Sequence, residues 1–227
     1  MFTNTLVSSD LGHAHGVDLE GTLDFLNTLD TENGFPVETL PTLDDALTWF
    51  VDRGVIHREG ADRVRAKAAT QTAAAAKDLD RVHTVRDALR EVAEAIAEHR
   101  APRASALNTV NRALHARQVI ELVPAPDGCS VDHRHVGDPI DDALARLAEP
   151  LVSELTGGHP ERIRVCASDT CDWIFYDASR TARRRWCDMS TCGNRAKAAR
   201  HRARTKAVTT EAETRTEDLA SEAGPAN

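Results

Sequence analysis

The sequence predicts a mainly α-helical protein with one small β-hairpin, followed by a C-terminal four-cysteine module of short strands and a basic helix. Three observations lead to this fold class. Apolar residues recur at helical spacing through most of the first 160 residues. Four of the five cysteines lie close together near the C-terminus, and a run rich in arginine and lysine follows them. Aromatic residues make up only 4% of the chain, so aliphatic side chains are expected to form the main core.

The helices of the N-terminal part are expected in six stretches. Each repeats apolar residues at helical spacing and is bounded by capping residues, glycine or proline. The expected ranges are 19–29, 43–53, 61–71, 77–100, 105–117 and 139–156. Thr42 is the expected N-cap of the second helix, because acidic residues follow it in the first turn. Pro150 is expected to kink the last helix.

A β-hairpin is expected before the last helix, in Val119–Val123 and Cys129–His133, where Asp127-Gly128 supplies the turn. The domain organisation follows from these elements. We expect a flexible start at residues 1–16, a helical domain at 17–160, a four-cysteine module at 161–207 and a disordered tail at 208–227. The tail carries five acidic residues and few large apolar ones, a composition that does not support a packed core.

The charge of the chain is distributed very unevenly. Residues 161–206 carry 12 lysine and arginine residues against 5 acidic residues, a net charge of +7. The remainder carries 16 against 31, a net charge of −15, and the whole chain has −8. A compact basic module joined to an acidic body is typical of a protein in which one part contacts a polyanion.

Several function classes are not expected from this sequence. The chain has no run of about 18 to 20 apolar residues and no secretory signal pattern at its start, so we expect a cytoplasmic protein without membrane contact. The motifs of phosphate loops, dinucleotide sites, zinc proteases and nucleophile elbows are absent from it. We therefore do not expect an enzyme.

The four clustered cysteines predict a metal site. They are Cys166, Cys171, Cys187 and Cys192, in the pattern C-x4-C, fifteen residues, C-x4-C. Two such pairs present four thiolates in a tetrahedron, as in structural zinc sites. Because cysteine fills every ligand position, we expect one zinc ion in a closed, non-catalytic site. The alternatives are ordinary structural cysteines and a redox disulfide switch, and a reversible zinc–thiolate sensor would combine metal binding with redox chemistry.

The residues between the cysteine pairs predict the rest of the module. Trp173–Tyr176 and Arg184–Trp186 are expected to form two strands in a zinc-ribbon-like arrangement. Two of the three tryptophans and the only tyrosine lie here and would supply a small core. A module of about 45 residues buries too little surface to fold alone, so zinc is expected to contribute much of its folding energy.

A basic helix is expected over residues 195–206, with Asn194 as its N-cap. Its alanines share one face, which is expected to lie close to the zinc module; they are Ala196, Ala199, Ala203 and Ala207. The cations expected to contact nucleic acid are Arg183, Arg184, Arg185, Arg195, Lys197, Arg200, Arg202, Arg204 and Lys206. A helix without acidic residues suits DNA phosphate and major-groove contacts. The alternatives are a solvated helix and one that pairs with the acidic body.

The C-terminal segment resembles the CGNR zinc-finger module, which is named for the residues Cys192-Gly193-Asn194-Arg195 of this sequence. The resemblance covers about residues 161–206 and includes all four cysteines. Upstream, Leu23–Thr28 resembles the "LDF-x-NT" opening of a helical domain called ABATE, Asp45–Trp49 and Arg86–Leu89 resemble two of its helices, and Asn111 or Asn108 resembles its later asparagine. The resemblance implies a bacterial stress-induced transcription regulator.

Polar residues embedded in apolar helices mark a second candidate site. They are Asn27, Thr28, Arg86 and Asn111, and they are expected either to line an effector pocket or to tie helices together. The function predicted for the whole chain is a zinc-dependent DNA-binding transcription regulator. Its expected partners are duplex DNA, a small-molecule effector and a second copy in a homodimer. The alternatives are a zinc-stabilised protein-interaction module and an RNA-binding protein.

Overall fold

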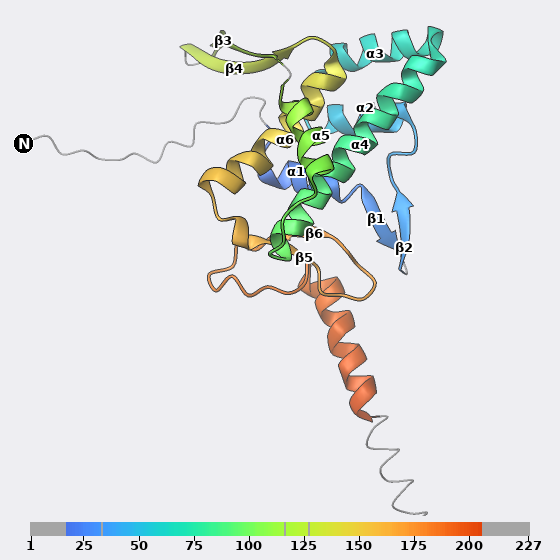
Figure 1. Cartoon of the computed structure of the whole chain (residues 1–227), viewed down its shortest axis with the longest axis vertical. Coiled ribbons are helices and arrows are strands. Elements are labelled where there is room, and N and C mark those ends of the chain that lie inside the picture. The colour runs from blue at the N-terminus through green and yellow to red at the C-terminus, as the bar shows by residue number, and fades with distance from the viewer. Residues whose placement is uncertain (1–16, 33, 116, 127, 206–227) are drawn as a thin grey trace, which may run out of the picture.

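The computed structural model describes residues 17–32, 34–115, 117–126 and 128–205 (Figure 1). The expected flexible start at 1–16, the tail at 208–227 and Lys206 lie outside these residues. The helices are α1 (Leu19–Leu26), α2 (Leu43–Asp52), α3 (Arg58–Thr70), α4 (Thr72–Ala97), α5 (Ala104–Leu114) and α6 (Pro139–Gly157). The strands are β1 (Leu29–Glu32), β2 (Phe35–Glu38), β3 (Arg117–Ala125), β4 (Gly128–Val136), β5 (Ile163–Val165) and β6 (Ile174–Tyr176).

The C-terminal end of the described chain is also helical. A short 3-10 turn, η1 (Pro160–Arg162), precedes β5, and a π-helical turn, η2 (Met189–Gly193), runs directly into a helix over residues 194–205. The predicted fold class is confirmed, because a mainly helical part with small hairpins precedes a four-cysteine cluster with short strands and a helix.

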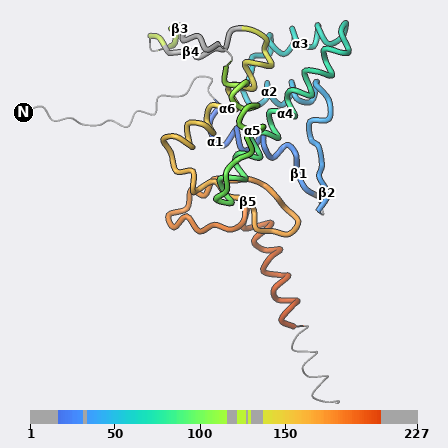
Figure 2. The backbone as a smooth tube through the Cα atoms, in the orientation of Figure 1, coloured from blue at the N-terminus to red at the C-terminus, as the bar shows by residue number. Residues whose placement is uncertain are grey.

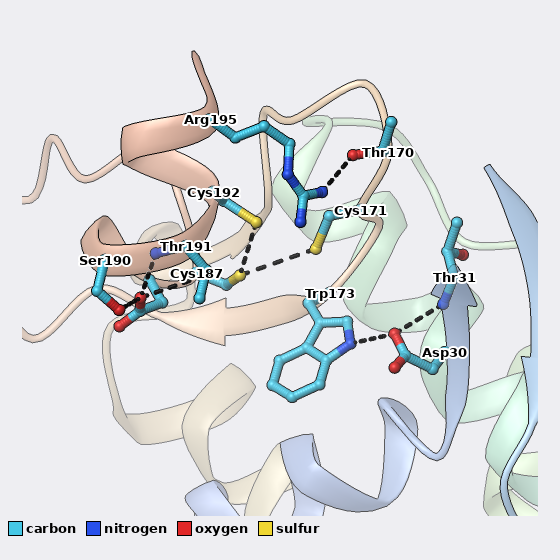
Figure 3. A pocket seen from close by; sticks show the side chains of 11 residues that line it. Asp30, Thr31, Thr170, Cys171, Trp173, Cys187, Ser190, Thr191, Cys192 and Arg195 are labelled. Atoms are coloured by element: carbon cyan, nitrogen blue, oxygen red, sulfur yellow. Dashed lines mark hydrogen bonds between the residues drawn. The ribbon is translucent and has the colours of Figure 1, made fainter. Parts of the chain in front are cut away.

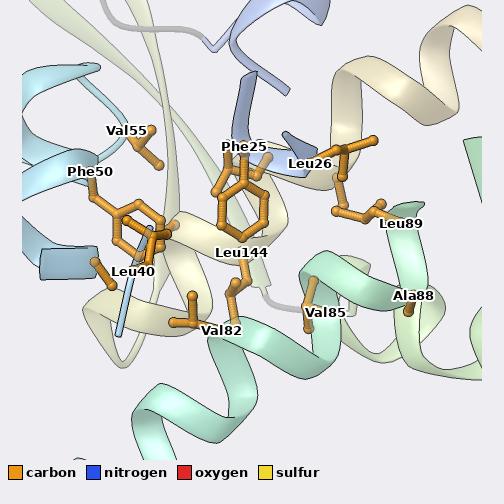
Figure 4. Packing of buried hydrophobic residues seen from close by; sticks show 14 of the residues in the cluster. Phe25, Leu26, Leu40, Phe50, Val55, Val82, Val85, Ala88, Leu89 and Leu144 are labelled. Atoms are coloured by element: carbon orange, nitrogen blue, oxygen red, sulfur yellow. The ribbon is translucent and has the colours of Figure 1, made fainter. Parts of the chain in front are cut away.

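Helix α4 organises the core. It is 26 residues long and packs against the five helices α1, α2, α3, α5 and α6 and against β5 and β6. Val82, Val85 and Leu89 are buried on its inner face, opposite Phe25 of α1 and Leu144 of α6 (Figure 4). Aliphatic residues dominate this cluster, as the low aromatic content predicts.

Local capping explains where the helices begin. The Thr42 hydroxyl accepts a hydrogen bond from the Asp45 backbone N–H, and the Asp45 carboxylate accepts one from the Thr42 N–H, which confirms the expected N-cap of α2. Asp138 caps α6 by a single hydrogen bond that its carboxylate accepts from the Ile140 N–H, with Pro139 in the first helical position. Helix α6 continues through Pro150 to Gly157.

The first helix ends earlier than the leucine spacing predicts. Leu29 does not continue α1 but begins β1, which pairs with β2 in an antiparallel hairpin. The Thr39 N–H and hydroxyl both donate to the Thr28 carbonyl and close the base of this hairpin. Gly34 in its turn has a φ of 84°, a conformation that favours glycine. The Asn33-Gly34 pair is a typical hairpin signal, and it explains why the chain turns back here and does not continue the helix.

The second hairpin confirms the prediction for residues 119–133 and extends it. Strands β3 and β4 have nine residues each and pair antiparallel, with Ile120 opposite His133. In Figure 1 this hairpin lies at one end of the helical part, far from the basic helix.

The strands of the C-terminal module differ from the prediction. Ile174–Tyr176 is a strand, as expected, but its partner is Ile163–Val165, and residues 184–186 form no strand. Arg184 explains this difference. Its backbone N–H donates to the Asp177 carboxylate, and its guanidinium donates to the carbonyls of Trp186 and Cys187. These hydrogen bonds hold residues 184–187 in an irregular conformation, so the segment does not extend as a strand.

Candidate metal centre

Four cysteine side chains converge in the C-terminal module. Cys166 follows β5, Cys171 precedes β6, Cys187 lies just before η2 and Cys192 lies within it. Their sulfur atoms all lie within 4.8 Å of one another. Turns on both sides of the fifteen-residue loop therefore bring the two C-x4-C pairs together, as the spacing predicts.

The distances between the sulfurs fit a zinc ion. The Sγ atoms of Cys171 and Cys187 are 3.8 Å apart, and those of Cys187 and Cys192 are 3.7 Å apart. Tetrahedral zinc with Zn–S bonds of about 2.3 Å separates its sulfurs by about 3.8 Å. A disulfide requires about 2.05 Å, and all four cysteines are free thiols. The donor set and its spacing are thus those of one structural zinc site with no ligand position left for water or substrate.

The electrostatics of the cluster favour a bound cation. Burial, together with the neighbouring sulfur of Cys166, raises the pKa of Cys171 to about 12. Burial and the sulfurs of Cys166 and Cys171 likewise raise the pKa of Cys187. The pKa of Cys192 is lowered despite its burial, because the thiols of Cys187, Cys171 and Cys166 hydrogen-bond to its sulfur. Ionisation of one sulfur thus opposes ionisation of its neighbours, and a divalent cation would stabilise all four in the deprotonated form.

The turns that carry the cysteines are held by local hydrogen bonds. The Cys187 N–H donates to the Cys166 sulfur at 3.5 Å, which links the two cysteine pairs directly. The Asp188 carboxylate caps η2 by accepting from the Thr191 N–H at 2.9 Å. A Cβ at Gly193 would lie 2.7 Å from the Met189 sulfur, so a larger residue there would displace the end of that exposed side chain.

Asp177 is the buried polar residue of the module. Its carboxylate accepts from the backbone N–H groups of Ser179 and Arg184 at 3.0 and 2.7 Å. Burial alone raises the pKa of Asp177, but these hydrogen bonds and the nearby Arg164 outweigh burial and lower it. The ionised carboxylate therefore holds the loop between β6 and Cys187 in place.

A pocket of about 550 Å³ lies beside the cysteines and reaches the β1–β2 hairpin (Figure 3). Trp173 lies at its edge, and its indole N–H donates to the Asp30 carboxylate at 2.6 Å. On the opposite side, the Arg195 guanidinium donates to the Thr170 hydroxyl at 2.5 Å. Arg195 begins the basic helix, so this bond ties the start of that helix to the first cysteine pair.

The predicted nucleic-acid residues fall into two groups. Arg183 and Arg185 are exposed, and so are the helical cations Arg195, Lys197, Arg200, Arg202 and Arg204. Arg184 is half-buried and turned inward, with its guanidinium 5.0 Å from the Phe175 ring. Arg185 and Arg200 both approach the Trp186 ring, at 5.2 and 6.0 Å. Arg184 is therefore bound within the module, whereas the others face solvent.

The alanine face of the basic helix does not pack as expected. Ala199 and Ala203 are exposed, and only Ala196 is half-buried. Figures 1 and 2 show residues 194–205 extending away from the rest of the protein. The prediction that this face lies close to the zinc module is wrong for Ala199 and Ala203, because the helix points outward from Cys192; Ala207 lies outside the described residues.

The four polar residues of the second candidate site do not meet in one place. The Thr28 hydroxyl donates to the Phe25 carbonyl and accepts from Arg86, which also forms a bidentate pair with Glu38 at 2.6 and 2.8 Å. Asn27 contacts β6 instead, and Asn111 is exposed on α5. The contacts of Asn27, Thr28 and Arg86 join elements of the fold, which corresponds to the second of the two roles expected for them.

Sequence reasoning missed two residues beside the metal centre. Arg90 on α4 is buried and bonded to Asp172, next to a cysteine, and Asp30 holds Trp173. An arginine on a helix ordinarily indicates a solvent-exposed position. Its position four residues after Arg86 on the same helix face was the available signal.

Comparison with known families agrees with this architecture. The CGNR zinc finger model matches residues 162–205, and the ABATE model, described as "Putative stress-induced transcription regulator", matches residues 22–158. No curated protein matches the chain significantly. Among the described helices, none is long and apolar enough to cross a lipid bilayer. With most of its length matched by one model and its four cysteines gathered within the other, the chain belongs to the ABATE family and carries a CGNR zinc finger at its C-terminal side.

Proposed function

We propose that this protein is a zinc-dependent transcription regulator that binds duplex DNA through the helix over residues 194–205. One observation carries the proposal: this helix is exposed along its length, contains no acidic residue and projects from a closed four-thiolate centre. Its cations Lys197, Arg200, Arg202 and Arg204 form no ion pair with any acidic residue of the described chain. They are therefore available to phosphates.

The distribution of charge around this helix favours a groove over a flat surface. At 3.6 residues per turn, Arg195 and Arg202 lie on one side, and the cations that line a common surface hollow, Lys197, Arg200 and Arg204, lie on the other. The exposed residues Ala199 and Ala203 lie between these two rows. A helix of about 10–12 Å diameter fits the major groove, which is about 12 Å wide. Small side chains would then face the base edges while the two cation rows face opposite phosphate strands.

Zinc has a defined part in this proposal. Cys192 lies in η2, which continues into the basic helix, and Arg195 is tied to Thr170 between the first two cysteines. Metal binding would therefore fix the direction of the helix relative to the protein. Loss of zinc would leave the helix on an unstructured tether and weaken binding by the entropy of ordering it.

The helical domain would supply the regulation. We propose that it is a non-catalytic sensing or dimerisation domain of a cytoplasmic regulator, with a small-molecule effector or a second copy as its partner. The ABATE family description supports a regulatory role in the stress response. The net charge of −15 outside the basic module would keep the rest of the chain away from the DNA backbone.

The test is binding of the zinc-loaded protein to duplex DNA, duplex RNA and single strands across a salt series. Each phosphate contact contributes a slope of about −0.9 to log K against log salt on B-DNA. Arg200→Ala with Arg204→Ala should flatten that slope by about 2 without loss of helicity. Arg58→Ala with Arg112→Ala removes the same charge from exposed positions of the helical domain and should leave the slope unchanged.

The other outcomes are equally specific. If the protein bound RNA as tightly as duplex DNA, or more tightly, we would conclude that its target is RNA. Absence of binding to any nucleic acid, with one zinc per chain, would reject the proposal and favour a zinc-stabilised protein-interaction module.

A further inference from the structure

The three residues that follow Cys171 each form hydrogen bonds with a different element of the helical domain. In chain order, Asp172, Trp173 and Ile174 are bonded to Arg90 of α4, Asp30 of β1 and Asn27 at the end of α1. The three residues directly after the zinc ligand Cys171 are therefore all hydrogen-bonded to the helical domain.

The Asn27 side chain acts as a substitute for a neighbouring strand. Its Nδ2 donates to the Ile174 carbonyl and its Oδ1 accepts from the Ile174 N–H, both at 2.9 Å and both buried. A carboxamide is the one neutral side-chain group that matches a peptide unit in this way. Replacing it with an apolar group would leave two buried backbone groups without partners, at about 1–3 kcal/mol each.

The Arg90 guanidinium forms hydrogen bonds with three segments of the chain. It donates to the Asp172 carbonyl at 2.6 Å and pairs with the Asp172 carboxylate at 2.8 Å. It also donates to the carbonyls of Leu26 and Leu29, each at 3.3 Å. The end of α1, the start of β1 and the loop after Cys171 therefore share one buried cation, whose removal would affect all three.

Apolar packing reinforces these bonds. Ile163 of β5 and Ile174 of β6 are each only 1% exposed and belong to the same hydrophobic cluster as α1 and α4. The cluster around the cysteines is separate and small, with Cys166, Phe175 and Cys192 as its buried members. The zinc finger therefore completes the core of the helical domain with one face of its strands and encloses the metal site with the other.

We propose that Asn27, Asp30 and Arg90 are positioning residues of the zinc centre, through which metal binding and the stability of the helical domain are thermodynamically linked. Linkage is reciprocal: if zinc stabilises α1 and α4, then α1 and α4 in their native positions strengthen zinc binding by the same factor. Any ligand or partner that displaces α1 or α4 would thereby change the zinc site and the direction of the basic helix. This inference does not depend on the target of that helix.

The first experiment measures zinc affinity of the full chain by competition with a chromophoric chelator. Arg90→Met and Asn27→Leu should weaken zinc binding by about 5- to 150-fold, the usual range of coupling between linked sites. Arg86→Met is the matched control. Arg86 is also a buried arginine of α4, one turn earlier, and its bonded partners among the described residues all lie within the helical domain. Its substitution should destabilise the protein and leave zinc affinity within about twofold.

The second experiment needs no variant to fold. Hydrogen exchange of the wild-type chain, with and without zinc, should show slower exchange in α1 and α4 when zinc is bound. Exchange in these helices that does not respond to zinc would overturn the proposal. So would equal loss of zinc affinity in the Arg86 and Arg90 variants, because that result would reflect general destabilisation and not positioning.

Discussion

The carboxamide of Asn27 forms two hydrogen bonds of 2.9 Å with the backbone of Ile174, across 147 residues of sequence. The pair joins the first helix of the ABATE domain to the strand that follows a zinc ligand. Because of this pair, loss of the metal site is expected to destabilise the helical domain as well as the zinc finger.

Cys187→Ser tests whether the two parts unfold together. Cys187 is central to the cluster, with sulfur neighbours at 3.7 and 3.8 Å, so the variant should lose zinc. From sequence alone, the helical domain would be expected to remain intact and to melt separately. The shared core predicts instead a single transition at lower temperature, with Tm falling roughly 2–4 °C for each kcal/mol lost. Calorimetry of the variant beside the zinc-loaded wild-type protein checks this.

Cys129→Ser is the control for that experiment, because Cys129 is an exposed cysteine in β4. It should keep its zinc and its Tm. A Cys187→Ser protein that shows an unaltered upper transition beside a new lower one would contradict the single cooperative unit.

Asp177→Asn tests the carboxylate that holds the loop between β6 and Cys187. Hydrogen bonding lowers the folded-state pKa of Asp177 despite its burial. A lowered pKa stabilises the fold above the unfolded value of about 3.9, and that contribution is lost as the pH falls through the folded pKa. The variant should cost about 2–3 kcal/mol at pH 7, and the gap to wild type should narrow below about pH 4.

Urea unfolding of both proteins at pH 7, 5 and 3.5 measures this gap. Asp169→Asn, at an exposed position of the same module, should stay within about 0.5 kcal/mol of wild type. Zinc content is measured at each pH, because loss of zinc would itself release this loop and narrow the gap. A gap for Asp177→Asn that is independent of pH would show that its charge is not what stabilises the loop.

Ala199→Trp tests whether the alanine face of the basic helix enters a groove. A bulky side chain there would stand between the two cation rows and hold the helix away from the bases, so duplex binding should weaken at least about tenfold, or roughly 1.4 kcal/mol. His201→Trp places the same side chain about 160° around the helix from Ala199, on the side opposite the alanine face, and should bind within about twofold of wild type. Fluorescence anisotropy with a labelled duplex measures both. If the two variants bind alike, the helix does not insert by this face, whereas the wider proposal of DNA binding would stand.

The helices and the zinc ligands were predictable because their signals are local. Apolar spacing predicts the ends of α2 to α6 to within five residues, with the largest difference at the start of α4, and the C-x4-C pairs identify all four sulfur donors. Turn chemistry was equally local for Thr42, which forms the expected capping box. In each case a few neighbouring residues contain the physical cause.

The relation between the helical part and the finger was not predictable from such signals. Arg90 and Asp172 are separated by 82 residues, and nothing near either one indicates the other. The strand partner of Ile174–Tyr176 was misassigned for the same reason, since alternation predicts a strand but not its neighbour. The alanines of the basic helix resemble a packing face in sequence, and only the direction in which η2 ends shows that they remain uncovered.

The placement of the three tryptophans gives the protein an intrinsic optical signal for each of its parts. Trp49 packs in the aromatic cluster with Phe25 and Phe50, Trp186 lies beside the cysteines, and Trp173 bridges the two regions through Asp30. Because Trp173 is 37% exposed, separation of the finger from β1 would hydrate its indole and shift its emission to longer wavelength, whereas the emission of Trp49 would not change. A chain that retains Trp173 alone would therefore report the opening of this junction in real time, without any added dye.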